Sequence, residues 1–82
     1  MYKLVLSDKA KKQLSRLSSD LQNRIGATFE RIIFRPHAFV KKKQGTPYFI
    51  LRIGSYRAIL DIKQNKLIIL VIEIGPRKKI YK

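Results

Sequence analysis

The sequence predicts an α+β fold in which a helical hairpin packs on one face of a mainly antiparallel four-stranded sheet. Two observations predict this class: apolar residues recur at helical spacing in the first half of the chain, and runs rich in β-branched and aromatic residues fill the second half. A third observation is length. A chain of 82 residues buries only about 60–65% of its unfolded surface, so we expect one domain over residues 1–82.

One strand and two helices are expected in the first half of the chain. Residues 2–6, YKLVL, predict the strand, and Ser7 is a suitable N-cap for a helix over DKAKKQLSRL. Ser19–Gln22, SDLQ, matches a capping box and predicts a second helix with Ser19 as its N-cap. Gly26 in that helix predicts close packing against a neighbour. The helix must end before Pro36, because the residue that precedes a proline is driven out of the helical region.

Three further strands are expected in the second half. They are YFILRI, YRAILDI and LIILVIEI, joined by Gly54-Ser55 and by the polar turn KQNK. Connections this short require an antiparallel meander. The segment HAFVKKKQGTP, between the second helix and the meander, is expected to be a basic loop. The predicted order is therefore β-α-α-β-β-β.

Strand alternation predicts which side chains share a face of the sheet. Arg52 points the same way as Tyr48 and Ile50, and Arg57 in the next strand points the same way as Ile59. The alternate positions in both strands are wholly apolar and must face the helices, so Arg52 and Arg57 should emerge on the open face. The last strand is apolar on both sides, which makes it central in the sheet or covered by a partner.

Positive charge is the unusual feature of the composition. Nineteen Lys and Arg residues against five Asp and Glu residues leave a net charge of +14, which favours a polyanion or an acidic protein as partner. Cations from separate segments, with Tyr81 beside them, would form a basic surface suited to single-stranded RNA. The expected RNA-binding lysines are Lys41, Lys42, Lys43, Lys78, Lys79 and Lys82.

Several classes of site are disfavoured. The chain has no cysteine and a single histidine, so we expect no disulfide, no metal site and no cofactor. MYKLVLSDK is not a signal peptide, and the longest apolar run, LIILVI, is too short to cross a bilayer. We therefore expect a cytoplasmic protein with no membrane association.

Simpler interpretations of the cations stay open at this point. Arg57 could be a structural arginine paired with Asp61 or Glu73, and Arg77 could be a solvated cation. The lysines of residues 41–43 could form a solvated loop. A pairing partner in the fold would decide the first of these alternatives.

The stretch YFILRIGSYRAIL, followed by an apolar strand and GPRKKIYK, resembles the RelE branch of the RelE/ParE toxin superfamily. The likeness covers nearly the whole chain: an aromatic-x-x-Leu-Arg-Ile-Gly-x-Tyr-Arg pattern fits residues 48–57, and Arg-x-x-x-Tyr fits residues 77–81. The resemblance implies a type II toxin that cleaves messenger RNA in the ribosomal A site by attack of the 2′-OH. It also implies a RelB-like acidic antitoxin, with which the toxin can form a heterotetramer.

The same resemblance implies roles for single residues. Arg57 would stabilise charge on the scissile phosphate, Arg77 would act on the phosphate or the leaving oxygen, and Tyr81 would stack on or activate the substrate. Arg52 occupies a position that is often a lysine in the family. Ile50 departs from the pattern, because some active members have a basic residue there, and this leaves the general base unassigned. A lysine or Tyr81 could serve as the base, or the step could rely on alignment alone.

Three other functions remain compatible with the sequence. A ParE-like toxin of the same fold would bind DNA gyrase instead of cutting RNA. A basic ribosomal or nucleic-acid-binding protein would use its charge for phosphate contacts without catalysis. A degenerate, inactive toxin would account for Ile50.

Overall fold

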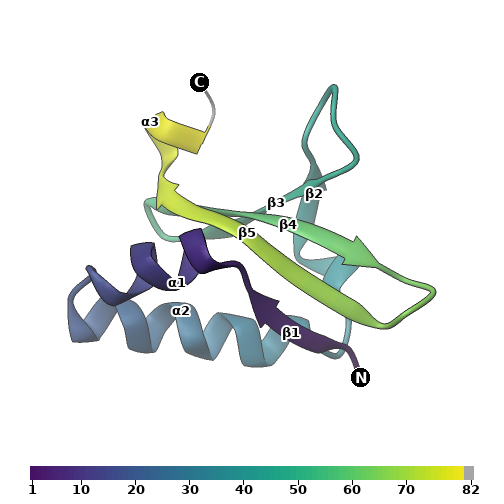
Figure 1. The fold of residues 1–82 in the computed structure, drawn as a ribbon, viewed down its shortest axis with the longest axis horizontal. Helices are drawn as coiled ribbons and strands as arrows, with labels where there is room; N and C mark the ends of the chain where they lie inside the picture. The colour runs from purple at the N-terminus through teal and green to yellow at the C-terminus, as the bar shows by residue number, and fades with distance from the viewer. Residues whose placement is uncertain (81–82) are drawn as a thin grey trace.

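Helices cover one face of a five-stranded sheet in the computed structural model, which describes residues 1–80 (Figure 1). The sequence of elements begins with a strand and ends with a short helix. The elements are β1 (Lys3–Leu6), α1 (Asp8–Ser15), α2 (Ser19–Ile32), the 3-10 helix η1 (Pro36–Ala38), β2 (Val40–Lys42), β3 (Phe49–Ile53), β4 (Tyr56–Lys63), β5 (Ile68–Pro76) and α3 (Arg77–Ile80).

The sheet has the strand order β1-β5-β4-β3-β2, with β1 parallel to β5 and the other pairs antiparallel. The α+β class and the meander β3-β4-β5 are thereby confirmed. The sheet has a fifth strand, β2, where the sequence predicted a loop. Val40 lies opposite Leu51, while Lys41 and Lys42 are exposed, which suits a short edge strand protected by lysines. A strand of three residues is too short to show the alternation of apolar and polar side chains from which a strand is predicted.

The connection between α1 and α2 differs from the predicted capping box. Ser18, not Ser19, is the N-cap of α2, and its Oγ accepts the backbone N–H three residues on at 3.3 Å. Gln22 instead donates to the carbonyls of Leu14 and Leu17, each at 3.1 Å. Both carbonyls lie at the C-terminal end of α1, where the next helical turn no longer supplies N–H donors, and Leu14 O also accepts the backbone N–H of Leu17 at 3.1 Å. Within residues 1–80 no helix combines the length and apolarity needed to cross a membrane.

The main core lies between the helices and the sheet. Its buried residues come from both helices and from the three meander strands: Ala10, Ile25, Phe29, Ile32, Leu51, Ile53, Ala58, Leu60, Ile69, Val71 and Ile74. The prediction that Gly26 permits close packing is wrong, since an added Cβ would meet nothing within 4 Å.

A β-bulge in β5 decides which side of this strand faces the core. Val71 and Glu73 pair with adjacent residues of β4, so Ile72 between them is an extra residue. Val71 and Ile74 consequently both point into the main core, although they are three residues apart. Uninterrupted alternation would have directed Glu73 toward the helices, where burying a carboxylate is costly.

Backbone groups of β5 beyond the end of β1 are satisfied by α1 and the residue that caps it. Ser7 donates its backbone N–H to Val71 O at 2.9 Å and its hydroxyl to Ile72 O at 2.7 Å. Gln13 Oε1 accepts the N–H of Ile74 at 2.7 Å. These side chains take the place of a neighbouring strand at this edge.

A smaller apolar cluster lies on the open face of the sheet. It consists of buried Ile50, Ile59 and Ile80, with Tyr48 and Ile72 packed against them. Ile80 belongs to α3 and is 3% exposed, so it fixes this short helix above the open face (Figure 1). Ile50, the departure from the RelE pattern, is part of the surface that holds α3.

Candidate functional site

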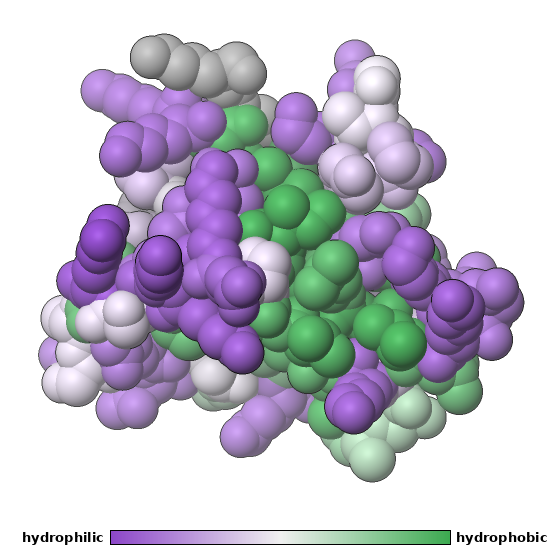
Figure 2. Space-filling model, viewed as in Figure 1, coloured by the Kyte–Doolittle hydropathy of each residue, from purple (hydrophilic) through white to green (hydrophobic). Residues whose placement is uncertain are grey.

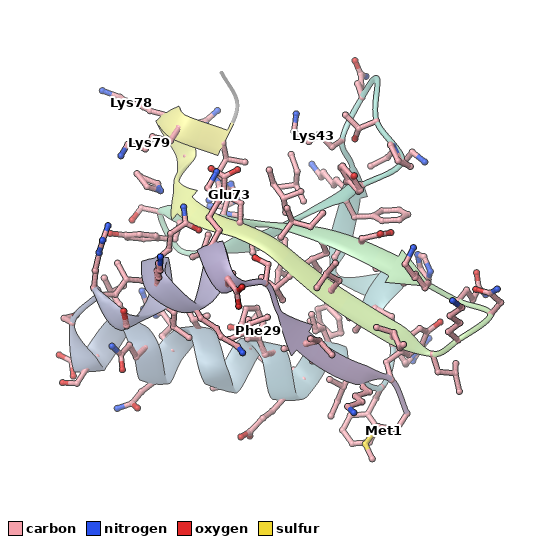
Figure 3. The ribbon with its side chains drawn as sticks, viewed as in Figure 1. Met1, Phe29, Lys43, Glu73, Lys78 and Lys79 are labelled. Carbon is pink, nitrogen blue, oxygen red and sulfur yellow. The ribbon has the colours of Figure 1, made fainter. Side chains whose placement is uncertain are left out.

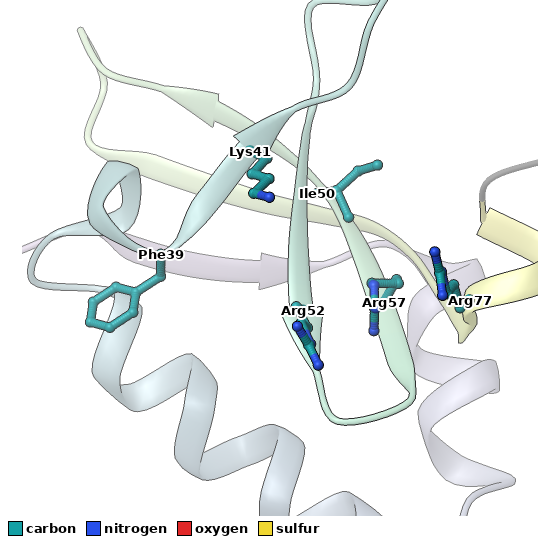
Figure 4. Close-up of a pocket in the computed structure, with 6 residues that line it drawn as sticks. All are labelled: Phe39, Lys41, Ile50, Arg52, Arg57 and Arg77. Carbon is teal, nitrogen blue, oxygen red and sulfur yellow. The ribbon is translucent and has the colours of Figure 1, made fainter.

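A hollow of about 440 Å³ lies on the open face of the sheet. Four of its lining residues are cations, and each comes from a different element, β2, β3, β4 or α3 (Figure 4). The lining residues are Phe39, Lys41, Ile50, Arg52, Arg57 and Arg77. The structure thus brings the three candidate arginines together with one of the candidate lysines.

Arg57 is buried, with 8% of its surface exposed. Its Nη1 donates to the carbonyls of Gly54 and Tyr56, each at 2.8 Å. Both bonds come from one nitrogen and fix the guanidinium, while Nε and Nη2 have no acceptor within the described residues. A planar group held in this way can donate to an anion in the hollow.

The carboxylates considered as partners of Arg57 pair with lysines. Asp61 lies 3.2 Å from Lys63 Nζ, and Glu73 lies 3.5 Å from Lys9 Nζ. The alternative that pairs Arg57 with Asp61 or Glu73 is therefore wrong for the described part of the chain. No carboxylate within residues 1–80 forms an ion pair with Arg57.

Arg52 and Arg77 flank Arg57 (Figure 4). Arg52 is exposed and is the register partner of Arg57 across β3 and β4. Arg77 is also exposed and begins α3, where its backbone N–H donates to Ser55 O at 3.2 Å. Like charges on directly opposed residues repel each other, and a bound anion would relieve that repulsion.

The lysines of residues 41–43 do not act as a group. Lys41 lines the hollow, whereas Lys42 Nζ lies 5.3 Å from the centre of the Phe49 ring. Lys42 and Lys43 border a neighbouring hollow together with Ile50. Of these three lysines, Lys41 has the position from which it could contact an anion beside the arginines.

Further cations lie around the open face. Lys43, on the β2–β3 connection, and Lys78 and Lys79, on α3, stand on two sides of it (Figure 3). Lys78 and Lys79 are exposed and do not line the main hollow. Tyr81 and Lys82 lie outside the described residues.

Sequence reasoning missed Phe39 and the role of Gly54. Phe39 is 45% exposed and lines the hollow, but one aromatic residue in an irregular segment gives no periodic signal. Gly54 has φ +60°, a conformation that favours glycine, and its carbonyl holds Arg57. In the described part of the chain, no three His, Asp or Glu side chains gather to hold a metal ion.

Comparisons with known proteins agree with this fold. A family model described as the ParE toxin of the type II toxin-antitoxin system parDE matches residues 4–81. No curated protein matches the chain.

Solved structures of toxin–antitoxin complexes contain chains of similar fold. A chain of the intact RelBE complex of E. coli aligns with a TM-score of 0.81 and 22% identity, over 93% of this chain and 96% of that chain. The corresponding values are 0.80, 23%, 93% and 94% for the archaeal RelE-RelB complex of Pyrococcus horikoshii. For the RelBE2 complex of Mycobacterium tuberculosis they are 0.83, 18%, 93% and 98%.

Proposed function

We propose that this chain, which belongs to the family of ParE toxins of type II toxin-antitoxin systems, is a ribosome-dependent endoribonuclease. It would cleave messenger RNA in the A site and so inhibit translation in the cytoplasm. One observation carries the proposal: Arg52, Arg57 and Arg77 line one hollow, with Lys41 at its edge. Guanidinium groups bind phosphate oxygens through paired N–H donors, so such a cluster suits a phosphodiester.

The chemistry we propose is transfer within the RNA. The O2′–P bond forms while the P–O5′ bond breaks, the 2′-OH gives its proton to a base, and the 5′ oxygen takes up a proton. Arg57 stabilises the negative charge that develops on the phosphoryl oxygens, because its guanidinium is already oriented by two backbone carbonyls. Arg77 assists at the phosphate or the leaving oxygen, and Arg52 binds the phosphate beside it.

Two residues are candidates for the remaining roles. Lys41 lines the hollow, which favours it over Lys42 and Lys43 as the general base. Tyr81 stacks on the substrate or supplies the base.

Ile50 cannot move a proton, but it packs with Ile80 of α3. We therefore interpret Ile50 as a support for the helix that carries Arg77, and the inactive-toxin alternative is not required to explain it.

The proposal requires the ribosome because the reacting atoms of the RNA must be aligned. Attack by the 2′-OH needs its oxygen in line with the leaving oxygen, and an arginine cluster stabilises charge without imposing that arrangement on a flexible strand. A decoding site that holds the messenger RNA would supply it. Rapid cleavage of free RNA by the purified protein would contradict this part of the proposal.

Product chemistry tests the reaction directly. Messenger RNA on ribosomes should yield fragments that end in a 2′,3′-cyclic phosphate. A single 2′-deoxy substitution at the cleaved position should abolish the cut, because no nucleophile remains. Cleavage that survives the 2′-deoxy substitution would overturn the proposed mechanism.

An acidic antitoxin of RelB type is the proposed partner. A band of apolar side chains follows β5 across the surface (Figure 2), where Ile68, Leu70 and Ile72 are half-buried and Val5 is 38% exposed. An amphipathic helix could cover this band, and acidic groups would complement the +14 charge. Coexpression with an acidic antitoxin of RelB type should give a stable complex, and size-exclusion chromatography with light scattering would show whether it is a heterotetramer.

A second candidate function is inhibition of DNA gyrase, which is what a ParE-like toxin would do, and the family model that matches the chain is described as a ParE toxin. The two functions predict different first effects in induced cells. Incorporation of labelled amino acids should stop before incorporation of labelled thymidine if the chain is an RNA-cleaving toxin. The reverse order would favour gyrase. A non-enzymatic RNA-binding protein would retain its effect in an Arg77→Ala variant that still binds RNA.

A further inference from the structure

A second hollow, of about 340 Å³, lies where α2 meets the β3–β4 hairpin. Arg24, Thr28 and Arg31 form one wall, because positions i, i+4 and i+7 share a face of a helix. Leu51 and Ile53 are buried and close its floor. Its lining residues are Arg24, Thr28, Arg31, Phe39, Leu51, Arg52, Ile53 and Gly54.

The second hollow adjoins the first. Phe39 and Arg52 line both hollows, and Figure 4 shows them on the side of the first hollow that faces α2. Gly54 links them as well: its carbonyl accepts from Arg57, and a Cβ added to it would lie 3.1 Å from Arg24 Nη1. An RNA strand that leaves the first hollow past Arg52 would therefore meet residues of the second hollow next.

The charge of the second hollow is unbalanced. Its described lining contains three arginines and no carboxylate. Arg24 and Arg31 are exposed, and the ion pairs formed within residues 1–80 by Asp61 and Glu73 involve neither. An exposed aromatic ring next to arginines is the combination that binds single-stranded RNA, in which phosphates contact guanidinium groups and a base stacks on the ring.

We propose that this hollow is a subsite for a nucleotide of the substrate RNA strand adjacent to the scissile one. Arg24 and Arg31 bind its phosphate, and Phe39 stacks on its base. The inference rests on the proposed function, because it assumes that the scissile phosphate occupies the first hollow. The subsite adds α2 to the proposed RNA-binding surface, whereas the sequence predicted only a core role for this helix.

Binding to RNA that cannot be cleaved tests the subsite separately from catalysis. The probe is a fluorescent 2′-O-methyl octanucleotide, titrated by anisotropy at several salt concentrations. We expect Arg24→Gln/Arg31→Gln to reduce the slope of log K against log salt concentration by about 0.7, since the two arginines bind one phosphate and each phosphate contact on a single strand contributes about 0.7. The control Arg16→Gln/Lys66→Gln removes the same charge at exposed positions elsewhere and should keep the wild-type slope.

Stacking is tested at Phe39. Phe39→Ala should weaken binding on the order of tenfold, and Phe39→Trp should restore it. Equal slopes for the two double variants, together with unchanged binding by Phe39→Ala, would overturn the subsite. If the variants give that result while the wild-type protein still cleaves messenger RNA on ribosomes, the proposed function stays intact. Wild type without cleavage would overturn the proposed function instead.

The source of the RNA is tested on ribosomes. Photoreactive p-benzoylphenylalanine at position 39 should cross-link to messenger RNA within a few nucleotides of the cleavage site. Cross-links to ribosomal RNA alone would overturn the assignment to the substrate strand. Circular dichroism melting should show that each variant is folded, which is expected because Arg24, Arg31 and Phe39 are exposed.

Discussion

Arg57 is held in place by two backbone carbonyls, and this determines what it can do. An arginine paired with a carboxylate would be electrostatically neutralised, whereas carbonyls orient the guanidinium and leave its charge in the hollow. The conformation of Gly54 is part of this arrangement, because its carbonyl accepts one of the two bonds. We therefore expect the β3–β4 turn to influence cleavage as well as stability.

Gly54→Ala tests this dependence. An alanine at φ +60° costs about 1–2 kcal/mol, and its methyl group would lie 3.1 Å from Arg24 Nη1. We expect a lower free energy of unfolding and slower cleavage. The control is Gly26→Ala in α2, where nothing lies within 4 Å and alanine should stabilise the helix by up to about 1 kcal/mol. Equal effects of both changes on urea unfolding would contradict the account.

The faces of residues in β3 and β4 could be predicted from the sequence. The contrast between Arg52 or Arg57 and the apolar alternate positions is strong, and both strands alternate without interruption. Phe39 could not be predicted, since its position depends on the path of an irregular segment. Gly26 was misjudged because sequence shows that a glycine is present but not what lies beside it.

Among the elements, α3 depends most on a single side chain. It has four described residues, too few for a stable isolated helix, and Ile80 alone is buried. Packing of Ile80 against Ile50 and Ile59 holds Arg77 at the hollow. In the proposed mechanism, Ile80 is thus a positioning residue.

Ile80→Ala should separate the position of α3 from the stability of the fold. We expect a large loss of cleavage, while urea unfolding shows a smaller loss than Ile25→Ala, which empties the main core and should cost about 2–5 kcal/mol. Ile80→Val should recover most of the cleavage. Lys66→Ala, an exposed change outside the candidate site, is the control. Full activity of Ile80→Ala would show that α3 does not position Arg77.

The edge of β5 provides a prediction of stability alone. Gln13→Leu removes the acceptor of the buried Ile74 N–H and should cost about 1–3 kcal/mol, measured by thermal or urea unfolding. Gln44→Leu, at an exposed position on the β2–β3 connection, should have little effect. An unchanged free energy of unfolding for Gln13→Leu would mean that water replaces the side chain at this edge.

The helices and the meander strands could be predicted because their patterns of apolar residues extend over many positions. The side of β5 that faces the core could not be predicted, since both sides are apolar and the bulge that decides it is not visible in the residue types. The shift from Ser19 to Ser18 at the α2 N-cap has a similar cause. Ser18 and Ser19 are adjacent, and either hydroxyl could cap the helix. The side chain of Gln22 donates to the carbonyls at the end of α1 instead of completing a capping box.

At the scale of the whole molecule, the main core and the candidate site lie on opposite faces of the sheet. The main core lies on the helix side, and the cations of the hollow lie on the other side together with a small cluster sealed by Ile80. This division lets the chain carry a charge of +14 while its core stays apolar.

A chain that ends at Pro76 should therefore keep its fold and lose its toxicity. None of the main-core residues lies beyond Ile74, but Arg77 and the cover of the small cluster are removed. Circular dichroism and growth after induction measure the two properties. The control keeps residues 77–82, carries the exposed change Arg16→Ala and should remain toxic. A truncated chain that arrests growth as strongly as wild type would show that the terminal segment is dispensable.

Primer extension on a messenger RNA under translation tests the central claim most directly. Wild type should produce new 5′ ends at ribosome positions, and Arg57→Ala and Arg77→Ala should each reduce them on the order of a hundredfold or more, as expected when one group that stabilises the transition state is lost. Arg16→Ala, an exposed change on the α1 side, should cut like wild type. No new ends with wild type, or cutting by Arg57→Ala and Arg77→Ala at the rate of Arg16→Ala, would contradict the account.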